Sequence, residues 1–100
     1  MLEIYQTRVF TLWLDRLADK RGQAAIQMRI DRLALGNPGD VEPVGQGVSE
    51  MRVHSGPGYR VYFVKRGLAI VVLLCGGGKK TQRADIRSAK DLAATLGDIG

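Results

Sequence analysis

The side chains best suited to chemistry lie between residues 50 and 83, where a histidine is accompanied by several cations. Histidine is the residue whose unperturbed pKa lies near neutrality, and His54 is the only histidine of the chain. Cleavage of RNA by its own 2′-hydroxyl requires a base for that proton, an acid for the leaving 5′-oxygen and cations around the phosphate. His54 and Glu50 are the candidate bases, and the candidate phosphate ligands are Arg60, Lys79 and Lys80. The alternative is that this histidine, which precedes a Gly-Pro turn, is a bystander.

The sequence also predicts how these side chains meet. Residues 48–54 and 59–65 alternate apolar and polar positions on either side of a Ser-Gly-Pro-Gly turn. A slip of one residue between paired strands turns every side chain to the other face, so the apolar positions select the register. Pairing of Val53 with Tyr59 places Tyr59 in the core and predicts one exposed polar face, which carries Glu50, Arg52, His54, Arg60 and Tyr62.

This register sets Arg52 opposite Arg60. Two cations that face each other on an exposed sheet repel, and a phosphate bound by bidentate guanidinium bonds would remove that repulsion. The alternative is that Glu50 neutralises one arginine and the group is an ion-paired surface. Tyr59 and Tyr62 are candidates for stacking on an RNA base or donating a proton, with Tyr62 favoured because it shares the polar face.

A run of three glycines and two lysines, residues 76–80, precedes the last predicted helix and provides a second candidate site. Glycines allow backbone N–H groups to converge on an anion, and a helix N-terminus adds positive potential. The run is not a Walker A motif, because Gly-Lys-Ser/Thr with its upstream glycine is missing. We expect an anion-binding loop here, with an ordinary flexible turn as the alternative.

Positive charge is concentrated in the second half of the chain. Residues 50–90 contain nine Lys/Arg and two acidic residues, whereas residues 1–49 contain six of each. Such a concentration of positive charge favours a polyanionic partner, either nucleic acid or an acidic protein. The alternative is a basic surface that only water solvates. One histidine and one cysteine are too few for a protein-only zinc site, and we expect no metal or cofactor. With no signal peptide and no apolar run of membrane length, we expect a cytoplasmic protein.

The sequence predicts one domain, residues 1–100, of the α+β class. A short strand over residues 2–6 is followed by a helix capped by Thr7 and, after a break at residues 19–22, by a second helix that ends near residue 35. Strands follow at residues 48–54, 59–65 and 68–75, the last apolar throughout, and a final helix spans residues 81–96. The expected order is β-α-α-β-β-β-α, with the helical hairpin and the C-terminal helix packed on a small, mainly antiparallel sheet.

Several motifs together resemble the RelE/ParE toxin superfamily. They are Val48-Ser49-Glu50-Met51-Arg52-Val53-His54, Gly56-Pro57-Gly58-Tyr59-Arg60-Val61-Tyr62-Phe63, Val71-Val72-Leu73-Leu74-Cys75-Gly76-Gly77, and Lys79-Lys80-Thr81-Gln82 followed by Asp85-Ile86. The chain is similar to the branch of addiction-module killer proteins, which also carries the labels phage-derived Gp49-like and HigB-like. The resemblance extends from the first strand to the final helix and implies the fold described above.

The resemblance implies the toxin of a type II toxin–antitoxin system, and many such toxins cleave mRNA in the ribosomal A site. Arg60 matches the superfamily's central-strand arginine, and Lys80 lies where ribosome-dependent members often place a second arginine. Ile86 departs from the pattern, because several members carry a catalytic tyrosine or histidine there. The expected catalytic residues are His54, Arg60, Glu50 and Lys80, and the expected residues for RNA or phosphate binding are Arg52, Lys79, Tyr62, Gln82 and Arg83.

The resemblance also implies a cognate antitoxin, similar to helix-turn-helix proteins and encoded by an adjacent gene. It would bind an apolar groove near the helical hairpin or cover the basic surface, and the toxin would reach operator DNA only through this complex. No membrane partner is expected. The leading hypothesis is a ribosome-dependent endoribonuclease that inhibits translation. Two alternatives stay open: a non-enzymatic, ParE-like inhibitor of DNA gyrase on the same fold, and a basic nucleic-acid-binding module without turnover.

Overall fold

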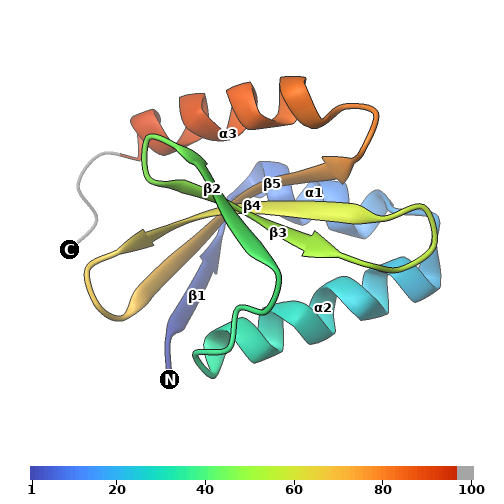
Figure 1. Ribbon diagram of the computed structural model, residues 1–100, viewed down its shortest axis with the longest axis horizontal. Helices are drawn as coiled ribbons and strands as arrows, with labels where there is room; N and C mark the ends of the chain where they lie inside the picture. The colour runs from blue at the N-terminus through green and yellow to red at the C-terminus, as the bar shows by residue number, and fades with distance from the viewer. Residues whose placement is uncertain (97–100) are drawn as a thin grey trace.

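The computed structural model describes residues 1–96 (Figure 1). A sheet of five strands forms the middle layer, with helices on both faces. Among these residues no helix has the length and apolar character needed to cross a membrane. The α+β class is confirmed, and one strand is added to the expected order. Along the chain the elements are β1 (Glu3–Gln6), α1 (Arg8–Arg16), α2 (Lys20–Ala34), β2 (Val41–Gly45), β3 (Val48–Val53), β4 (Tyr59–Arg66), β5 (Ile70–Gly78) and α3 (Gln82–Thr95).

The sheet has the strand order β1-β5-β4-β3-β2. All neighbouring strands are antiparallel except β1 and β5, which are parallel. The register between β3 and β4 is the expected one: Val53 faces Tyr59, Arg52 faces Arg60, and Glu50 faces Tyr62. Glu50, Arg52, Arg60 and Tyr62 therefore share one face of the sheet.

Each face of the sheet has its own apolar core. On one face, α1 and α2 contribute Phe10 and Ile26, which pack with Met51 of β3. On the other face, α3 contributes Ala89, which packs with Val64 of β4. Because β5 lies between these two layers, it is buried on both faces, as its uninterrupted apolar run predicts. Burial of each large apolar side chain contributes about 1.5–3 kcal/mol.

Two side chains fix where the helices of the hairpin begin. The Thr7 hydroxyl accepts the N–H of Phe10 at 3.1 Å, as the sequence predicts, and Asp19 accepts the N–H of Gly22 at 3.0 Å. Asp19 also accepts the hydroxyl of Tyr59 at 2.7 Å, and this bond lowers the pKa of the Asp19 carboxyl. Tyr59 is therefore held in the core on the face of α1 and α2.

Two strands differ from the prediction. The sequence does not predict β2, because Pro43 interrupts its alternation and most of its residues are exposed. Proline is tolerated here because β2 is an edge strand with a bulge between Pro43 and Gly45. The last predicted strand begins at Ile70 rather than Leu68, since Leu68 is exposed in the turn between β4 and β5.

The prediction of an anion-binding loop at residues 76–80 is wrong for its three glycines. These three glycines continue β5 and pair with β4, and none of them has a positive φ. Successive N–H groups of a strand point to opposite sides, so they do not converge on one anion. Close packing explains the glycines instead: a Cβ atom on Gly76 would lie 2.3 Å from the Trp13 ring, and one on Gly77 would lie 1.9 Å from Asp85 Oδ2.

The substitution Gly76→Ala tests this packing. The added methyl group would meet the Trp13 ring, so we expect the free energy of unfolding to fall by about 1–3 kcal/mol, the usual cost of overpacking a core. Chemical denaturation followed by circular dichroism measures the change. Gly78→Ala is the matched control, because its Cβ would lie 3.9 Å from the nearest atom, and it should keep or slightly raise stability. Equal stabilities of the two variants would contradict the packing.

Candidate functional site

A small cleft of about 20 Å³ lies where β3 ends and β4 begins, next to the segment that joins β5 to α3. A Cβ atom on Gly58 would lie 3.0 Å from Lys79 Cε, so this glycine leaves room for the lysine beside the turn. The cleft brings together four of the expected site residues, which come from three separate parts of the chain. Its polar side chains are Arg52, His54, Arg60 and Lys79, and the other lining residues are Val53, Gly58 and Tyr59.

Next to the cleft, the carboxylate of Glu50 accepts three side-chain donors. Its Oε1 accepts Arg60 Nη1 at 2.7 Å and Arg52 Nε at 3.3 Å. Its Oε2 accepts Gln82 Nε2 at 2.9 Å, and this bond connects β3 to the first turn of α3. Glu50 is only 1% exposed, and a buried charge is tolerated only when it is paired and hydrogen-bonded. The geometry therefore agrees with the alternative interpretation, in which Glu50, rather than a phosphate, relieves the repulsion between the arginines.

The two arginines differ in how far they are neutralised. The Arg52 guanidinium lies 3.5 Å from Asp40 Oδ1 and also contacts Glu42 and Glu50. The bond to Glu42 is the main cause that raises the pKa of Arg52. Arg60, by contrast, has Glu50 as its acidic partner within residues 1–96 and is 15% exposed. Because a guanidinium has five N–H donors, Arg60 keeps donors for an anion in the cleft.

Two side chains expected on an exposed face are buried. Glu50 and Tyr62 are almost completely covered, because α3 packs on this face of the sheet. Within the described part of the chain, the Tyr62 hydroxyl has no hydrogen-bond partner. Burial, and next the charge of Glu50, raise the pKa of Tyr62. The prediction of exposure is wrong because strand alternation identifies a face but does not tell how far a helix extends over it.

His54 follows β3 and remains accessible, with 73% of its side chain exposed. Its Nε2 lies 2.8 Å from Oδ2 of Asp40. This hydrogen bond is the main cause that lowers the pKa of Asp40, so the carboxylate is ionised at neutral pH. The sequence analysis misses Asp40, because it lies 14 residues away from His54 and just before the strand that the sequence does not predict. The only local feature of the sequence that could have pointed to this residue is an acidic side chain directly after Gly39.

The remaining expected site residues lie outside the cleft. Lys80 and Arg83 are exposed beside the start of α3. Gln82 binds Glu50 and thus contributes to the position of the arginines. Ile86 packs against the core under α3, so position 86 supplies no polar group.

Cys75 is buried within β5. Burial raises the pKa of its thiol to about 12, which makes it unreactive as a nucleophile near neutral pH. Its Sγ donates to the Asp85 carbonyl oxygen at 3.6 Å. Within residues 1–96, no three side chains of His, Cys, Asp or Glu gather into a group that could hold a metal ion.

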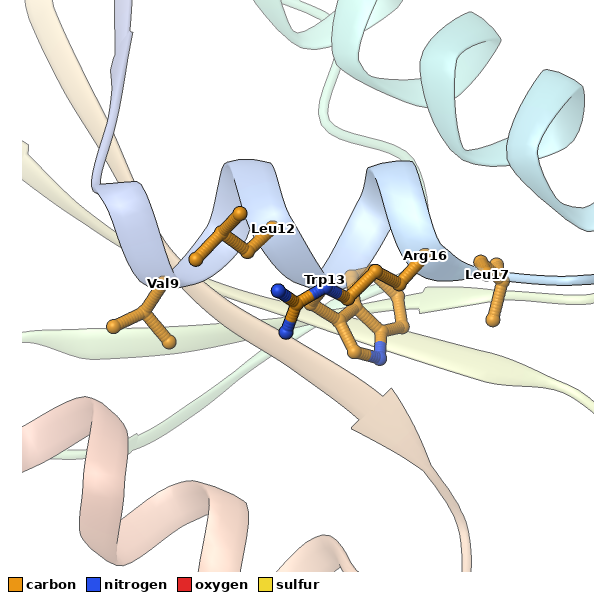
Figure 2. A pocket seen from close by; sticks show the side chains of 5 residues that line it. All are labelled: Val9, Leu12, Trp13, Arg16 and Leu17. Carbon is orange, nitrogen blue, oxygen red and sulfur yellow. The ribbon is translucent and has the colours of Figure 1, made fainter.

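A second concave surface lies along α1 (Figure 2). α1 belongs to the face of the sheet opposite α3, and its apolar side chains are only partly used by the core. Figure 2 shows the side chains that line this groove, which include Trp13 and Arg16. Val9 is exposed, whereas Leu12, Trp13 and Leu17 are half-buried. The groove is lined by Val9, Leu12, Trp13, Arg16 and Leu17.

Comparison with known proteins gives two matches. The family model described as "Phage derived protein Gp49-like (DUF891)" matches residues 12–96, which include every residue of the cleft. A protein of Haemophilus influenzae, described as uncharacterized, is 46% identical over 96 residues. The aligned region covers 96% of this chain and 97% of that relative.

The substitution Glu50→Ala tests the role of the buried carboxylate. It leaves Arg52, Arg60 and Gln82 without their shared acceptor, and breaking a buried ion pair costs about 3–5 kcal/mol. We expect the free energy of unfolding, measured by urea denaturation, to fall by about that amount. Glu42→Ala is the control, because it removes an exposed partner of Arg52, and exposed ion pairs contribute only about 0–1 kcal/mol. If both variants were equally stable, Glu50 would not have the role described.

Proposed function

This chain belongs to the phage-derived Gp49-like family, a toxin-like family within the RelE/HigB-like toxin group, and from that premise we propose its activity. We propose that it is a ribosome-dependent endoribonuclease that cleaves mRNA and thereby inhibits translation. The observation that carries the proposal is the cleft, where His54, Arg60 and Lys79 lie on one surface. A base and cations are what cleavage of RNA by its own 2′-hydroxyl needs.

In this proposal Arg60 and Lys79 hold the scissile phosphate. Arg60 uses Nη1 for Glu50 and has further N–H donors for a phosphate oxygen. Lys79 lines the same cleft and adds a full positive charge. Negative charge accumulates on the phosphate as the 2′-oxygen attacks. Cations that are already in position before the attack therefore stabilise the transition state more than the ground state. Arg52, which three carboxylates surround, adds less to this potential.

His54 is the base of the proposed reaction. It removes the proton of the 2′-hydroxyl, the 2′-oxygen bonds to phosphorus, and the bond from phosphorus to the 5′-oxygen breaks. The ammonium group of Lys79 gives a proton to the leaving 5′-oxygen. The products are a 2′,3′-cyclic phosphate and a 5′-hydroxyl end.

Glu50, the other candidate base, supports the site in a different way. Three donors already bind its carboxylate, and α3 covers it, so it holds the arginines rather than removing a proton from substrate. We assign Gln82 the same supporting role. Lys80 and Arg83 lie beside the cleft on the surface, where they would contact phosphates farther along the RNA strand.

We propose that an antitoxin partner binds the groove of α1. The apolar side chains Val9, Leu12 and Trp13 would pack against an amphipathic segment, and Arg16 would pair with an acidic side chain of that segment. The expected partner is a helix-turn-helix protein from an adjacent gene, which would link the toxin to operator DNA.

Inhibition of DNA gyrase without catalysis is the second candidate function. Two observations favour it: position 86 carries a packed isoleucine, and Glu50 already binds both arginines. A supercoiling assay with purified gyrase separates this candidate from RNA cleavage.

The test of the leading proposal is to map mRNA 5′ ends after brief induction of the protein in bacteria. We expect growth arrest with new 5′-hydroxyl ends inside coding regions. Lys79→Ala should lower the cleavage rate of translated mRNA about 10²-fold, the usual effect of losing one donor that stabilises the transition state. Lys65→Ala is the control, because Lys65 is exposed at the other end of β4, and it should cleave like the wild type.

Two results would contradict this proposal. Growth arrest without new 5′ ends, combined with loss of supercoiling by purified gyrase, would support the second candidate instead. Equal cleavage by Lys79→Ala and the wild type would show that the cleft is not the site of the reaction.

A further inference from the structure

We propose that Asp40 is a positioning residue, which holds His54 in the orientation and protonation form required of a base. This inference rests on the proposed endoribonuclease function and adds a residue that the sequence analysis does not identify. Asp40 does not line the cleft itself, and in this proposal it does not touch the RNA. Its Oδ1 contacts Arg52, and its Oδ2 forms a carboxylate–histidine pair with His54 at 2.8 Å, through which it acts on the reaction.

The geometry of the pair determines which ring nitrogen is available. When the neutral imidazole donates its Nε2–H to Asp40 Oδ2, the lone pair of the ring lies on Nδ1. The carboxylate therefore favours one of two tautomers and limits rotation of an otherwise exposed ring. Without this partner, a histidine with 73% of its side chain exposed would sample several rotamers and both tautomers.

Asp40 is itself held in place by the backbone around it. The N–H of Arg52 donates to the carbonyl oxygen of Asp40 at 2.9 Å, which anchors the loop to β3. Arg29 of α2 binds the carbonyl oxygens of Pro38, at 2.9 Å, and of Arg52, so one guanidinium links the loop and the strand. Gly39 has φ +69, and a Cβ atom there would lie 2.8 Å from Arg29 Nη2. The glycine thus gives Arg29 access to the loop.

The charges around His54 fit a base that becomes a cation during the reaction. Asp40 approaches it from the loop before β2, Arg52 lies two residues earlier on β3, and Lys79 lines the cleft from the segment after β5. Asp40 is ionised at neutral pH and stabilises the imidazolium, whereas the two cations oppose it. Asp40 therefore offsets the repulsion between the imidazolium of His54 and the cations of the cleft.

The proton transfers involve the substrate, His54, Lys79 and water. The O–H bond of the 2′-hydroxyl breaks, an Nδ1–H bond forms on His54, and the freed electron pair of the 2′-oxygen bonds to phosphorus. The P–O5′ bond breaks and the 5′-oxygen takes a proton from Lys79. The proton on Nδ1 then passes to water and Lys79 regains a proton from water, while Nε2–H remains bonded to Asp40 throughout.

Two variants separate this role from a general effect of charge. Asp40→Asn removes the carboxylate beside His54, whereas Glu42→Gln removes a carboxylate that contacts Arg52 and has no contact with His54. Because His54 is the only histidine of the chain, the ¹⁵N shifts of its ring report directly which nitrogen carries the proton. The wild type and Glu42→Gln should show Nε2–H alone, and Asp40→Asn should show a mixture of tautomers.

The rate of cleavage provides the second measurement. Loss of the Asp40 charge should lower the maximal rate about 10-fold, because the ring loses the partner that orients it. Asp40→Glu, which keeps the charge, should recover part of the rate. An unchanged tautomer and an unchanged cleavage rate in Asp40→Asn would overturn the inference. If the wild type cleaves no RNA, the endoribonuclease proposal itself fails, and the role of Asp40 fails with it even where the tautomer shift is observed.

Discussion

The buried carboxylate of Glu50 is the interaction on which the polar end of the sheet depends. The apolar side chains of β3 and β4 select a register that brings Arg52 and Arg60 face to face, and that register would be costly without an anion between them. Glu50 supplies the anion, and its third donor, Gln82, connects the same carboxylate to α3. A single buried charge thus joins two strands and a helix at the point where the cleft opens.

The same network creates a gradient of charge across the cleft. Toward the edge strand β2, Arg52 is neutralised by Asp40, Glu42 and Glu50. Toward the segment after β5, Arg60 keeps free donors and Lys79 lines the cleft. An anion is therefore attracted to the Arg60 side, while the acidic side holds the histidine. The glycines of β5 contribute by packing rather than by binding anions, because they accommodate Trp13 on one face and Asp85 on the other.

Periodicity predicts the parts of this structure that depend on apolar burial. The helical hairpin, the register of Val53 with Tyr59 and the doubly buried β5 follow from the spacing of apolar residues. Burial of Glu50 and Tyr62 does not, because it depends on where α3 crosses the sheet. The Asp40–His54 pair cannot be predicted from local sequence patterns either. It requires an edge strand that contains a proline and a loop held by Arg29. Composition shows where along the chain the charge is concentrated, but only the tertiary contacts show which cations of residues 1–96 keep donors without an acidic partner in that range.

We propose that the cleft binds an RNA phosphate at Arg60 and Lys79. An NMR titration with a short RNA whose 2′-hydroxyls are methylated tests this binding, because such an RNA lacks the nucleophile for cleavage. We expect shift changes centred on Arg60, Lys79 and His54, with an affinity that falls as salt rises. Changes confined to the α1 groove, or no change at low salt, would contradict it.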